Sequence, residues 1–306
     1  MVIVPSCRQR LTEMLLCAAA IVLLPAAGSF AQDDPAQLNP AQMEAARLFQ
    51  QINWTRGPAT APIGSRAEIT LPEGFMITDR AGSQLWNQLT QNPPDGTIAT
   101  LMPTSDDLSW FLCFEFDEVG YVKDDEKDEL DADAILEAMQ EGTEQSNQYR
   151  RSQGWTAIHV AGWVYPPSYD ETTNNLYWAT RLTSDDGDEN ANYSTRLLGR
   201  RGVMQVTLVC GVEEMPTVVP QVQEMLRTGF QFNSGEKYAE WRDGDKLATY
   251  GLTGLITGGA VVAAAKTGLL ARLGLVLAKA GKAIFAVIAV ILGGIYRLFG
   301  GGRAEE

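Results

Sequence analysis

Charge is distributed so unevenly along this chain that its middle and its two ends cannot fold in the same surroundings. Residues 32–245 carry 35 Asp and Glu against 15 Lys and Arg, whereas residues 246–306 carry 7 Lys and Arg against 2 Glu. Both ends also contain long apolar stretches. This asymmetry is typical of a polar domain flanked by membrane-facing segments. The net charge of −14 argues against a nucleic-acid partner, because phosphate neutralisation needs Lys and Arg.

The first 31 residues have the layout of a secretory signal peptide. Arg8 and Arg10 precede a charge-free apolar stretch at 14–24. Small side chains at Ser29 and Ala31 suit a signal peptidase, so we expect cleavage after Ala31. The stretch is shorter than the roughly 20 residues that a spanning helix needs. An uncleaved N-terminal anchor is the alternative.

The C-terminal region, 246–306, predicts a membrane anchor. Two apolar stretches, about 249–265 and 283–299, could each form a short span, and a basic loop at 266–282 separates them. Basic residues in a short loop stay cytoplasmic, and a cleaved signal peptide places the body outside. Both features therefore agree on a helical hairpin in the lipid bilayer, with a cytoplasmic loop. The alternative is a single span, with 249–265 re-entrant or peripheral.

Two glycines in the first predicted span, Gly254 and Gly258, have GxxxG spacing. This spacing permits close helix–helix contact, and hence self-association through the membrane helices. Glycine is also common in membrane helices that make no such contact.

The body is expected to be an α+β domain over residues 66–245, preceded by a linker or N-terminal arm at 32–65. Helices are predicted at 83–91 and 130–151, and a last helix is predicted to open at Pro220. Alternating patterns predict strands at 66–71, 75–77, 97–102, 109–116, 157–165, 176–183, 193–198, 203–210 and 230–232. The first two strands have the pattern of a hairpin, and Pro166-Pro167 that of a turn. Short connections favour an antiparallel sheet with packed helices.

Four motifs along the body resemble those of a bacterial family of predicted membrane-anchored proteins, known as domain of unknown function 2167. They are Phe114 to Asp125 with Gly120-Tyr121-Val122-Lys123-Asp124-Asp125, then Gly162-Trp163 with Pro167-Ser168-Tyr169-Asp170, then Leu176-Tyr177-Trp178-Ala179, and the junction from Gly235 through Ala248-Thr249-Tyr250-Gly251-Leu252. The resemblance covers roughly residues 67–299. It implies a signal peptide, an extracytoplasmic domain and a C-terminal anchor in the bacterial inner (cytoplasmic) membrane, and it supplies no activity. The layout is also similar to the sandwich of the photosynthetic extrinsic PsbP type, by fold analogy only.

No catalytic, cofactor-binding or metal-binding residue can be assigned from the sequence. The acidic run at 124–133 lacks the glycine and terminal glutamate of a calcium loop, so it is interpreted as a solvated helix start. Glu115 lies between Phe114 and Phe116 and is expected on the more exposed side of its strand. The single histidine, His159, has no partner motif nearby and is expected to be structural.

Five aromatic residues around the Pro-Pro pair could form a partner patch. They are Trp163, Tyr165, Tyr169, Tyr177 and Trp178. Aromatic residues with a polar edge are enriched at recognition surfaces, although they are also ordinary sheet residues.

Cys113 and Cys210 would remain after signal cleavage, in a compartment that permits disulfides. They could pair if their strands are neighbours and their side chains share a face. The sequence leaves both the bonded and the free state open.

Two functions remain open. The first is a non-enzymatic binding or scaffolding module of the cell envelope, tethered to the membrane, with an envelope protein or a second copy of itself as partner. The second is a carboxylate-dependent hydrolase or ligand-binding enzyme acting on an envelope substrate. The second needs at least two acids with shifted pKa values in one pocket; Glu115, Asp124 and Asp170 are the candidates.

Overall fold

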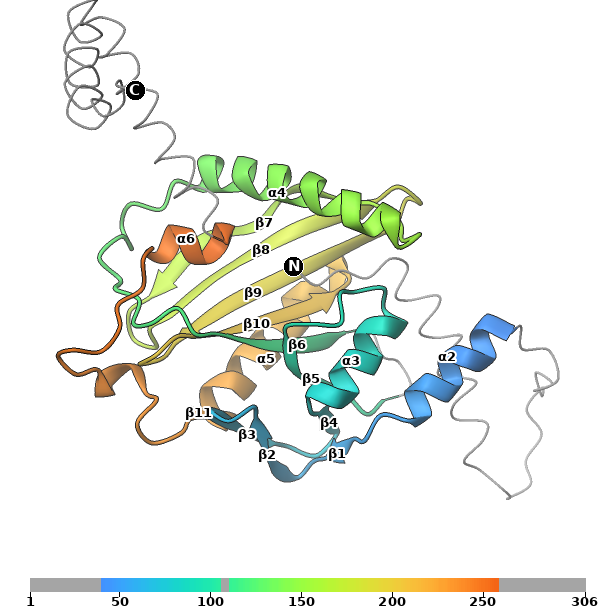
Figure 1. Cartoon of the computed structure of the whole chain (residues 1–306), viewed down its shortest axis with the longest axis horizontal. Coiled ribbons are helices and arrows are strands. Elements are labelled where there is room, and N and C mark those ends of the chain that lie inside the picture. The colour runs from blue at the N-terminus through green and yellow to red at the C-terminus, as the bar shows by residue number, and fades with distance from the viewer. Residues whose placement is uncertain (1–39, 106–109, 259–306) are drawn as a thin grey trace, which may run out of the picture. The chain divides into compact units, whose positions relative to one another are not determined.

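An eight-stranded antiparallel sheet forms the centre of the fold (Figure 1). The computed structural model describes residues 40–105 and 110–258. The strands run in the order β1-β4-β5-β6-β10-β9-β8-β7. Their bounds are β1 Thr55–Arg56, β4 Phe75–Thr78, β5 Thr97–Pro103, β6 Phe111–Asp117, β7 Ile158–Asp170, β8 Asn175–Ser184, β9 Glu189–Leu198 and β10 Val203–Cys210.

A second sheet and a helix cover one face of the large sheet. The second sheet has the order β11-β3-β2, with β2 Ala59–Ile63, β3 Ala67–Leu71 and β11 Phe230–Phe232. The helix is α5, Met215–Gly229, which follows the 3-10 turn η2 at Val212–Glu214. Apolar residues from these elements form the largest core with the inward side chains of the large sheet. We call this side the α5 face.

Four helices cover the opposite face in two groups. Over β4–β6 lie α2, Pro40–Gln50, and α3, Arg80–Leu89, around the buried Trp86. Over β8–β10 lie α4, Ala132–Ser152, and α6, Leu252–Thr257. The α4 N-cap is Asp131, whose carboxylate accepts a hydrogen bond from the Ala134 N–H at 3.0 Å. We call this side the α4 face.

The α+β class, the antiparallel sheet and each predicted strand are confirmed, with shifted ends. The predicted hairpin of the first two strands is wrong. β3 pairs with β2 and β11 in the small sheet, whereas β4 pairs with β1 and β5 in the large sheet. Alternation identifies a strand but not its partner, so the turn between them was read as a hairpin turn instead of a crossing between sheets.

Three proline positions also differ from expectation. Pro166 and Pro167 lie inside β7, and Pro220 lies inside α5, which already begins at Met215. β7 is an edge strand, so a proline, which has no backbone N–H, can lie on its free side without loss of a hydrogen bond of the sheet. The predicted arm at 32–65 is part of the fold over its described residues, because α2, β1 and β2 come from it. β2 contains Pro62 and is likewise an edge strand.

A segment at residues 233–251, here called the C-terminal strap, joins β11 to α6. It contains the 3-10 turn η3, Tyr238–Glu240. Tyr121 stacks on Tyr238 with ring centroids 4.5 Å apart, and the Tyr121 backbone hydrogen-bonds to Lys246 and Ala248. The Arg200 guanidinium donates two hydrogen bonds to the Asp245 carboxylate, from Nε at 2.6 Å and from Nη2 at 2.8 Å. These contacts hold the strap along the end of the sheet and so place α6 against α4.

The described part of the first predicted span belongs to this domain. α6 has six residues and ends at Gly258, whose positive φ of 63° stops the helix. Leu252, Leu255 and Ile256 are buried against the α4 side of the core. None of the helices in the described ranges is long and apolar enough to cross a membrane. The remaining part of this predicted span, the second predicted span and the predicted signal peptide lie outside the described residues, and a second unit of the chain begins at Gly259.

Candidate functional site

A pocket of about 550 Å³ lies on the α4 face, between the large sheet and the helices α4 and α6. We call it the arginine pocket. Side chains from β6, β8, β9 and β10 form its floor, and α4 and α6 form its roof. Residues that line it include Glu115, Asp117, Thr180, Ser194, Arg196, Gln205 and Thr207 on the floor, and Met139, Ser146, Arg150, Gly254, Leu255 and Thr257 on the roof.

Strand register explains why the floor is polar. On β9 the odd positions Ala191, Tyr193 and Leu197 enter the core of the α5 face, so the even positions point to the α4 face. Across the sheet, Arg196 is opposite Gln205, which is opposite Glu115. Glu115 is therefore two strands away from Arg196, or about 10 Å between Cα atoms at the usual spacing of 4.7–4.9 Å.

Arg196 is the defining side chain of the pocket. It is 8% exposed, and its guanidinium carbon lies 4.6 Å from the centre of the Trp178 ring. Nη1 donates to the Thr195 carbonyl at 3.3 Å, while the enclosed Nε has no hydrogen-bond partner among the described residues. Burial lowers the pKa of the Arg196 guanidinium to about 10, so the group is still charged at neutral pH.

Arg150 places a second guanidinium at the pocket, from α4. It is 4% exposed; Nε donates to the Thr156 carbonyl at 2.7 Å and Nη1 to the Gln91 carbonyl at 3.2 Å. Its Nη2 is buried and, within the described ranges, has no partner. Burial lowers the pKa of this guanidinium. Buried N–H donors are almost always paired, with protein or with ordered water, and these two guanidinium donors have no protein partner among the described residues.

The two acids of the pocket already have partners. Glu115 accepts a hydrogen bond from the Thr97 hydroxyl at 3.3 Å, and Asp117 accepts one from the Tyr250 hydroxyl at 3.1 Å. They lie on β6, at the far side of the floor from Trp178. Both carboxylates act electrostatically on Arg196 and partly offset the effect of burial on its pKa. The Ser194 and Thr180 hydroxyls line the pocket on β9 and β8, away from β6.

Arg196 does not stand out as a site residue in the sequence alone. A signal was present: the strand at 193–198 has a charged residue, Arg196, on the face that it shares with Ser194. Two positions on such a face, Ser194 and Arg196, are polar beside Tyr193 and Leu197. Nothing in the sequence places α4 and α6 over this face, and it is their cover that turns Arg196 into a buried residue.

The predicted aromatic patch is divided by the sheet. Trp163, Tyr169 and Trp178 pack in the core of the α4 face, whereas Tyr177 packs against the core of the α5 face. Trp178 is 2% exposed, and the Trp163 Nε1 donates to the Ala132 carbonyl at 3.2 Å. Tyr165 is exposed on the edge strand β7. The five residues therefore do not form one surface, because neighbouring positions of a strand point to opposite faces.

Cys113 and Cys210 are free and buried. Their strands are neighbours, but Cys113 is opposite Thr207, three positions from Cys210. An odd separation puts the two thiols on opposite faces, in the clusters around Trp86 and α5. The disulfide that the sequence allowed is not formed for this reason.

The glycines of the GxxxG pair have local roles in the described residues. A Cβ on Gly254 would lie 2.6 Å from the Cβ of Tyr250, so glycine permits the close turn from the strap into α6. Gly258 ends that helix.

The acids of the predicted run and His159 make structural contacts. Asp124 accepts a hydrogen bond from the Tyr169 hydroxyl at 3.1 Å, and Glu126 accepts one from the Thr253 N–H at 3.3 Å. His159 lies between Glu144, at 2.6 Å, and Asp185, at 2.9 Å, as expected of a structural histidine. Within residues 40–105 and 110–258, no three His, Cys, Asp or Glu side chains are grouped to hold a metal ion.

The family motifs meet at one end of the domain. Tyr121 and Asp124 come from the first motif, Tyr169 from the second and Tyr238 from the junction, and their contacts secure the strap. Burial and the neighbouring Asp124 raise the pKa of Tyr169, so its hydroxyl remains a donor. The motifs thus position α6, the helix that closes the arginine pocket.

These features define an α+β sandwich domain with a polar pocket enclosed between its sheet and its helices. The chain belongs to the family described as "Protein of unknown function (DUF2167)", whose sequence model matches residues 55–292. The match begins at β1 and so includes β1 and β2, which precede the predicted domain start. A search of curated proteins gives no match.

Two solved structures are similar in layout. The solution structure of cyanobacterial PsbP (CyanoP) from Synechocystis sp. PCC 6803 is 12% identical, covers 69% of this chain and 99% of its own, and gives a TM-score of 0.34. The crystal structure of PA94, a protein of unknown function from Pseudomonas aeruginosa, is 9% identical, covers 56% and 94%, and gives a TM-score of 0.23.

Proposed function

We propose that this domain is a non-enzymatic ligand-binding module of the bacterial cell envelope, and that its arginine pocket binds a small oxyanion, a carboxylate or a phosphate. The observation that carries the proposal is the buried Nε of Arg196, which has no acceptor among the described residues. A buried charged donor without a partner costs stability, so its presence favours a bound acceptor over a structural role.

The chemistry of the surrounding groups fits an oxyanion. A guanidinium presents its N–H groups in a planar fork that matches the oxygens of a carboxylate or phosphate. Trp178 holds the Arg196 side chain in place by stacking, which fixes the fork before a ligand arrives. The Thr180 and Ser194 hydroxyls line the same part of the pocket and can donate further hydrogen bonds. The low dielectric of the enclosed site strengthens each contact.

The arrangement of the acids favours binding over hydrolysis. The alternative function needs two acids in one pocket with pKa values moved apart. Glu115 lies in the arginine pocket, Asp124 is bonded to Tyr169, and Asp170 accepts from the Thr172 N–H and Thr173 hydroxyl on the β7–β8 hairpin. The three candidate acids are thus in three separate places, and the two acids of the arginine pocket, Glu115 and Asp117, each already accept a hydrogen bond from a neighbouring hydroxyl.

Titration calorimetry of the purified full chain with inorganic phosphate and with succinate tests the proposal. At least one of the two anions should bind, and Arg196→Met should weaken that binding at least tenfold. Arg181→Met is the matched control: Arg181 lies on β8, is paired with Glu189 at 2.8 Å and is outside the pocket. Absence of binding by both anions, or equal binding to Arg196→Met, would overturn the proposal.

We further propose that the domain is extracytoplasmic and anchored through residues 259–306 in the inner membrane. The charge-free stretch at 283–296, the basic residues Arg297 and Arg303 after it and the signal-like N-terminus support this. With 249–258 in the domain, 283–299 remains as the predicted span, which favours the single-span alternative.

Labelling with a membrane-impermeant maleimide in intact spheroplasts tests the location. The buried Cys113 and Cys210 will not compete, so Ser234→Cys, at an exposed position of the strap, reports on the domain. It should be labelled, and Glu305→Cys should be protected if there is one span. Protection of Ser234→Cys would contradict the location, and labelling of Glu305→Cys would restore the hairpin.

A further inference from the structure

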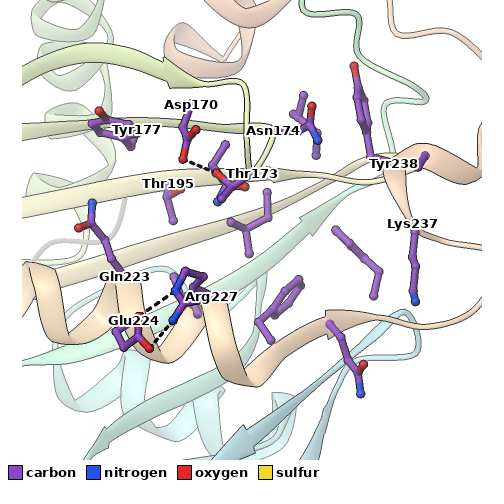
Figure 2. A pocket seen from close by; sticks show the side chains of 18 of the residues that line it. Asp170, Thr173, Asn174, Tyr177, Thr195, Gln223, Glu224, Arg227, Lys237 and Tyr238 are labelled. Carbon is purple, nitrogen blue, oxygen red and sulfur yellow. Dashed lines mark hydrogen bonds and ion pairs between the residues drawn. The ribbon is translucent and has the colours of Figure 1, made fainter.

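We propose that a second cleft, on the opposite face of the large sheet, binds a neutral saccharide. The cleft has a volume of about 780 Å³ and lies between β8, β9, α5 and the start of the strap. We call it the tyrosine cleft. Tyr177 and Gln223 lie at one end, and Lys237 and Tyr238 lie at the other (Figure 2). The volume is within the range of about 300–1,000 Å³ that is usual for small-molecule sites.

The same strand serves both sites. Arg196 points from β9 into the arginine pocket, while Tyr193, Thr195 and Leu197 point from β9 into the tyrosine cleft. The two sites are thus separated by the thickness of one sheet, and this proposal does not depend on the anion site.

Aromatic and aliphatic side chains give the cleft an apolar floor and wall. Tyr177 and Tyr193 lie on neighbouring strands with ring centroids 6.3 Å apart and an angle of 31° between their planes. Phe230 and Phe232 also line the cleft, and their rings pack edge to face with centroids 5.1 Å apart. The face of an aromatic ring carries negative charge density. The C–H groups on one side of a sugar ring are weakly positive and pack well on such faces.

Uncharged donors and acceptors alternate with these rings. The Gln223 amide donates to the Tyr193 hydroxyl at 3.0 Å, and this bond holds both groups at the cleft. Burial raises the pKa of Tyr193 to about 12, so its hydroxyl stays neutral. Hydroxyl and amide groups of Thr173, Asn174, Thr195 and Gln231 line the remaining surface. Such groups both donate and accept, as sugar hydroxyls do.

The charges at the cleft balance one another, which distinguishes it from the arginine pocket. Four charged residues line it, two acidic and two basic: Asp170, Glu224, Arg227 and Lys237. Glu224 and Arg227 form a two-point ion pair at 2.6 and 2.8 Å (Figure 2). Asp170 accepts hydrogen bonds from its own hairpin at 2.8 and 2.9 Å. None of the buried unpaired atoms found in the described ranges belongs to a residue of this cleft.

These features select a ligand that is neutral, rich in hydroxyl groups and apolar on its ring faces. An anion would find the basic groups either paired or, for Lys237, exposed at the rim. A purely apolar ligand would bury the hydroxyl and amide groups without partners, which is costly. A saccharide can pack its ring faces on the aromatic side chains and hydrogen-bond its hydroxyl groups to the polar side chains. A glycan of the envelope and a free oligosaccharide would both present this chemistry.

Calorimetry and saturation-transfer NMR on the purified full chain test the proposal with three neutral probes: maltotriose, cellotriose and triacetylchitotriose. The detergent should carry no sugar headgroup, since it would compete. At least one probe should bind. Tyr177→Ala should weaken binding at least tenfold, whereas Tyr149→Ala, at an exposed position on α4 outside the cleft, should leave affinity within twofold.

A second pair of variants guards against loss of folding. Gln223 and Gln221 are both exposed on α5, but only Gln223 lines the cleft. Gln223→Ala should weaken binding at least threefold, and Gln221→Ala should not change it. The probes are tested up to 10 mM, which is roughly ten times a Kd of about 1 mM and would nearly saturate such a site. The proposal is overturned if no probe binds at this concentration, or if the two glutamine variants behave alike. Tighter binding of an envelope glycan than of any free trisaccharide would identify the polymer as the source.

Discussion

The guanidinium carbon of Arg196 lies over the Trp178 ring, 4.6 Å from the ring centre, and among the described residues its Nε has no hydrogen-bond acceptor. Stacking on an aromatic face stabilises a cation, but it does not replace a missing hydrogen bond. The side chain is therefore oriented without being satisfied. Such an arrangement is expected where a residue is kept for binding at a cost in stability.

Replacing Arg196 by Met should leave the free energy of unfolding unchanged or raise it, by up to about 2 kcal/mol. Methionine keeps the length that packs on Trp178 and removes the buried charge. Urea unfolding of the full chain, followed by tryptophan fluorescence, measures the change. A loss of more than about 2 kcal/mol would identify Arg196 as a structural residue instead.

Leu252 tests whether α6 belongs to the domain. This side chain is fully buried, so Leu252→Ala should lower the free energy of unfolding by about 2–5 kcal/mol. Leu247, five residues earlier in the strap, is 45% exposed and is the matched control. Leu247→Ala should change stability by no more than about 0.5 kcal/mol. Equal effects of the two variants in urea unfolding would mean that α6 does not pack on the domain in solution.

His159 should make stability depend on pH. Hydrogen bonds that His159 donates to Asp185 and then to Glu144 raise the pKa of His159 above its usual value of 6.5. A raised folded-state pKa adds stability that is fully present below 6.5 and is lost as the pH rises through the folded-state pKa. Glu144, whose pKa is lowered mainly by His159, stays ionised over this range.

The difference in unfolding free energy between the wild-type chain and His159→Gln should therefore be largest near pH 6 and shrink towards about pH 9. Parallel urea titrations at these two values measure it. Thr183→Val, at the β8 position opposite His159, is a suitable control, because it adds no titrating group. A difference that stays constant, or grows, with rising pH would contradict a stabilising interaction of protonated His159 with Glu144 and Asp185.

Both remaining thiols should be unreactive in the folded chain. Burial raises the pKa of Cys210 to about 12, and burial also raises the pKa of Cys113. The thiolate is the reactive form, so a chromogenic disulfide reagent at pH 8 should modify neither thiol until denaturant is added. In a chain lacking residues 1–31, denaturation should then release both. Recovery of only one thiol, or of none without reductant, would indicate a disulfide.

The sequence allowed the strands to be predicted well because each has one side in a core. The alternation of Leu112, Phe114 and Phe116 and that of Met204, Val206 and Leu208 could be recognised directly, and these residues meet in the core of the α5 face. The partners could not be predicted in the same way. β3 and β4 are three residues apart in the chain yet belong to different sheets, since pairing depends on elements as distant as β11.

The candidate sites depended still more on tertiary structure. The aromatic residues at 163–178 were grouped by their nearness in the chain, and the sheet then separated them onto two faces. Arg196 gained its role only when α4, from residues 132–152, and α6, from residues 252–257, covered β9. Tyr193 and Gln223 likewise come together across thirty residues.

The amino-acid sequence by itself determined the α+β class, the positions of most strands, and the division into an acidic body and two apolar, basic ends, because periodicity and charge are local properties of the chain. Only the tertiary structure decided where the body ends, which face each aromatic residue occupies and which polar groups are buried without partners. Burial and pairing arise from segments far apart in the chain, so no local pattern records them.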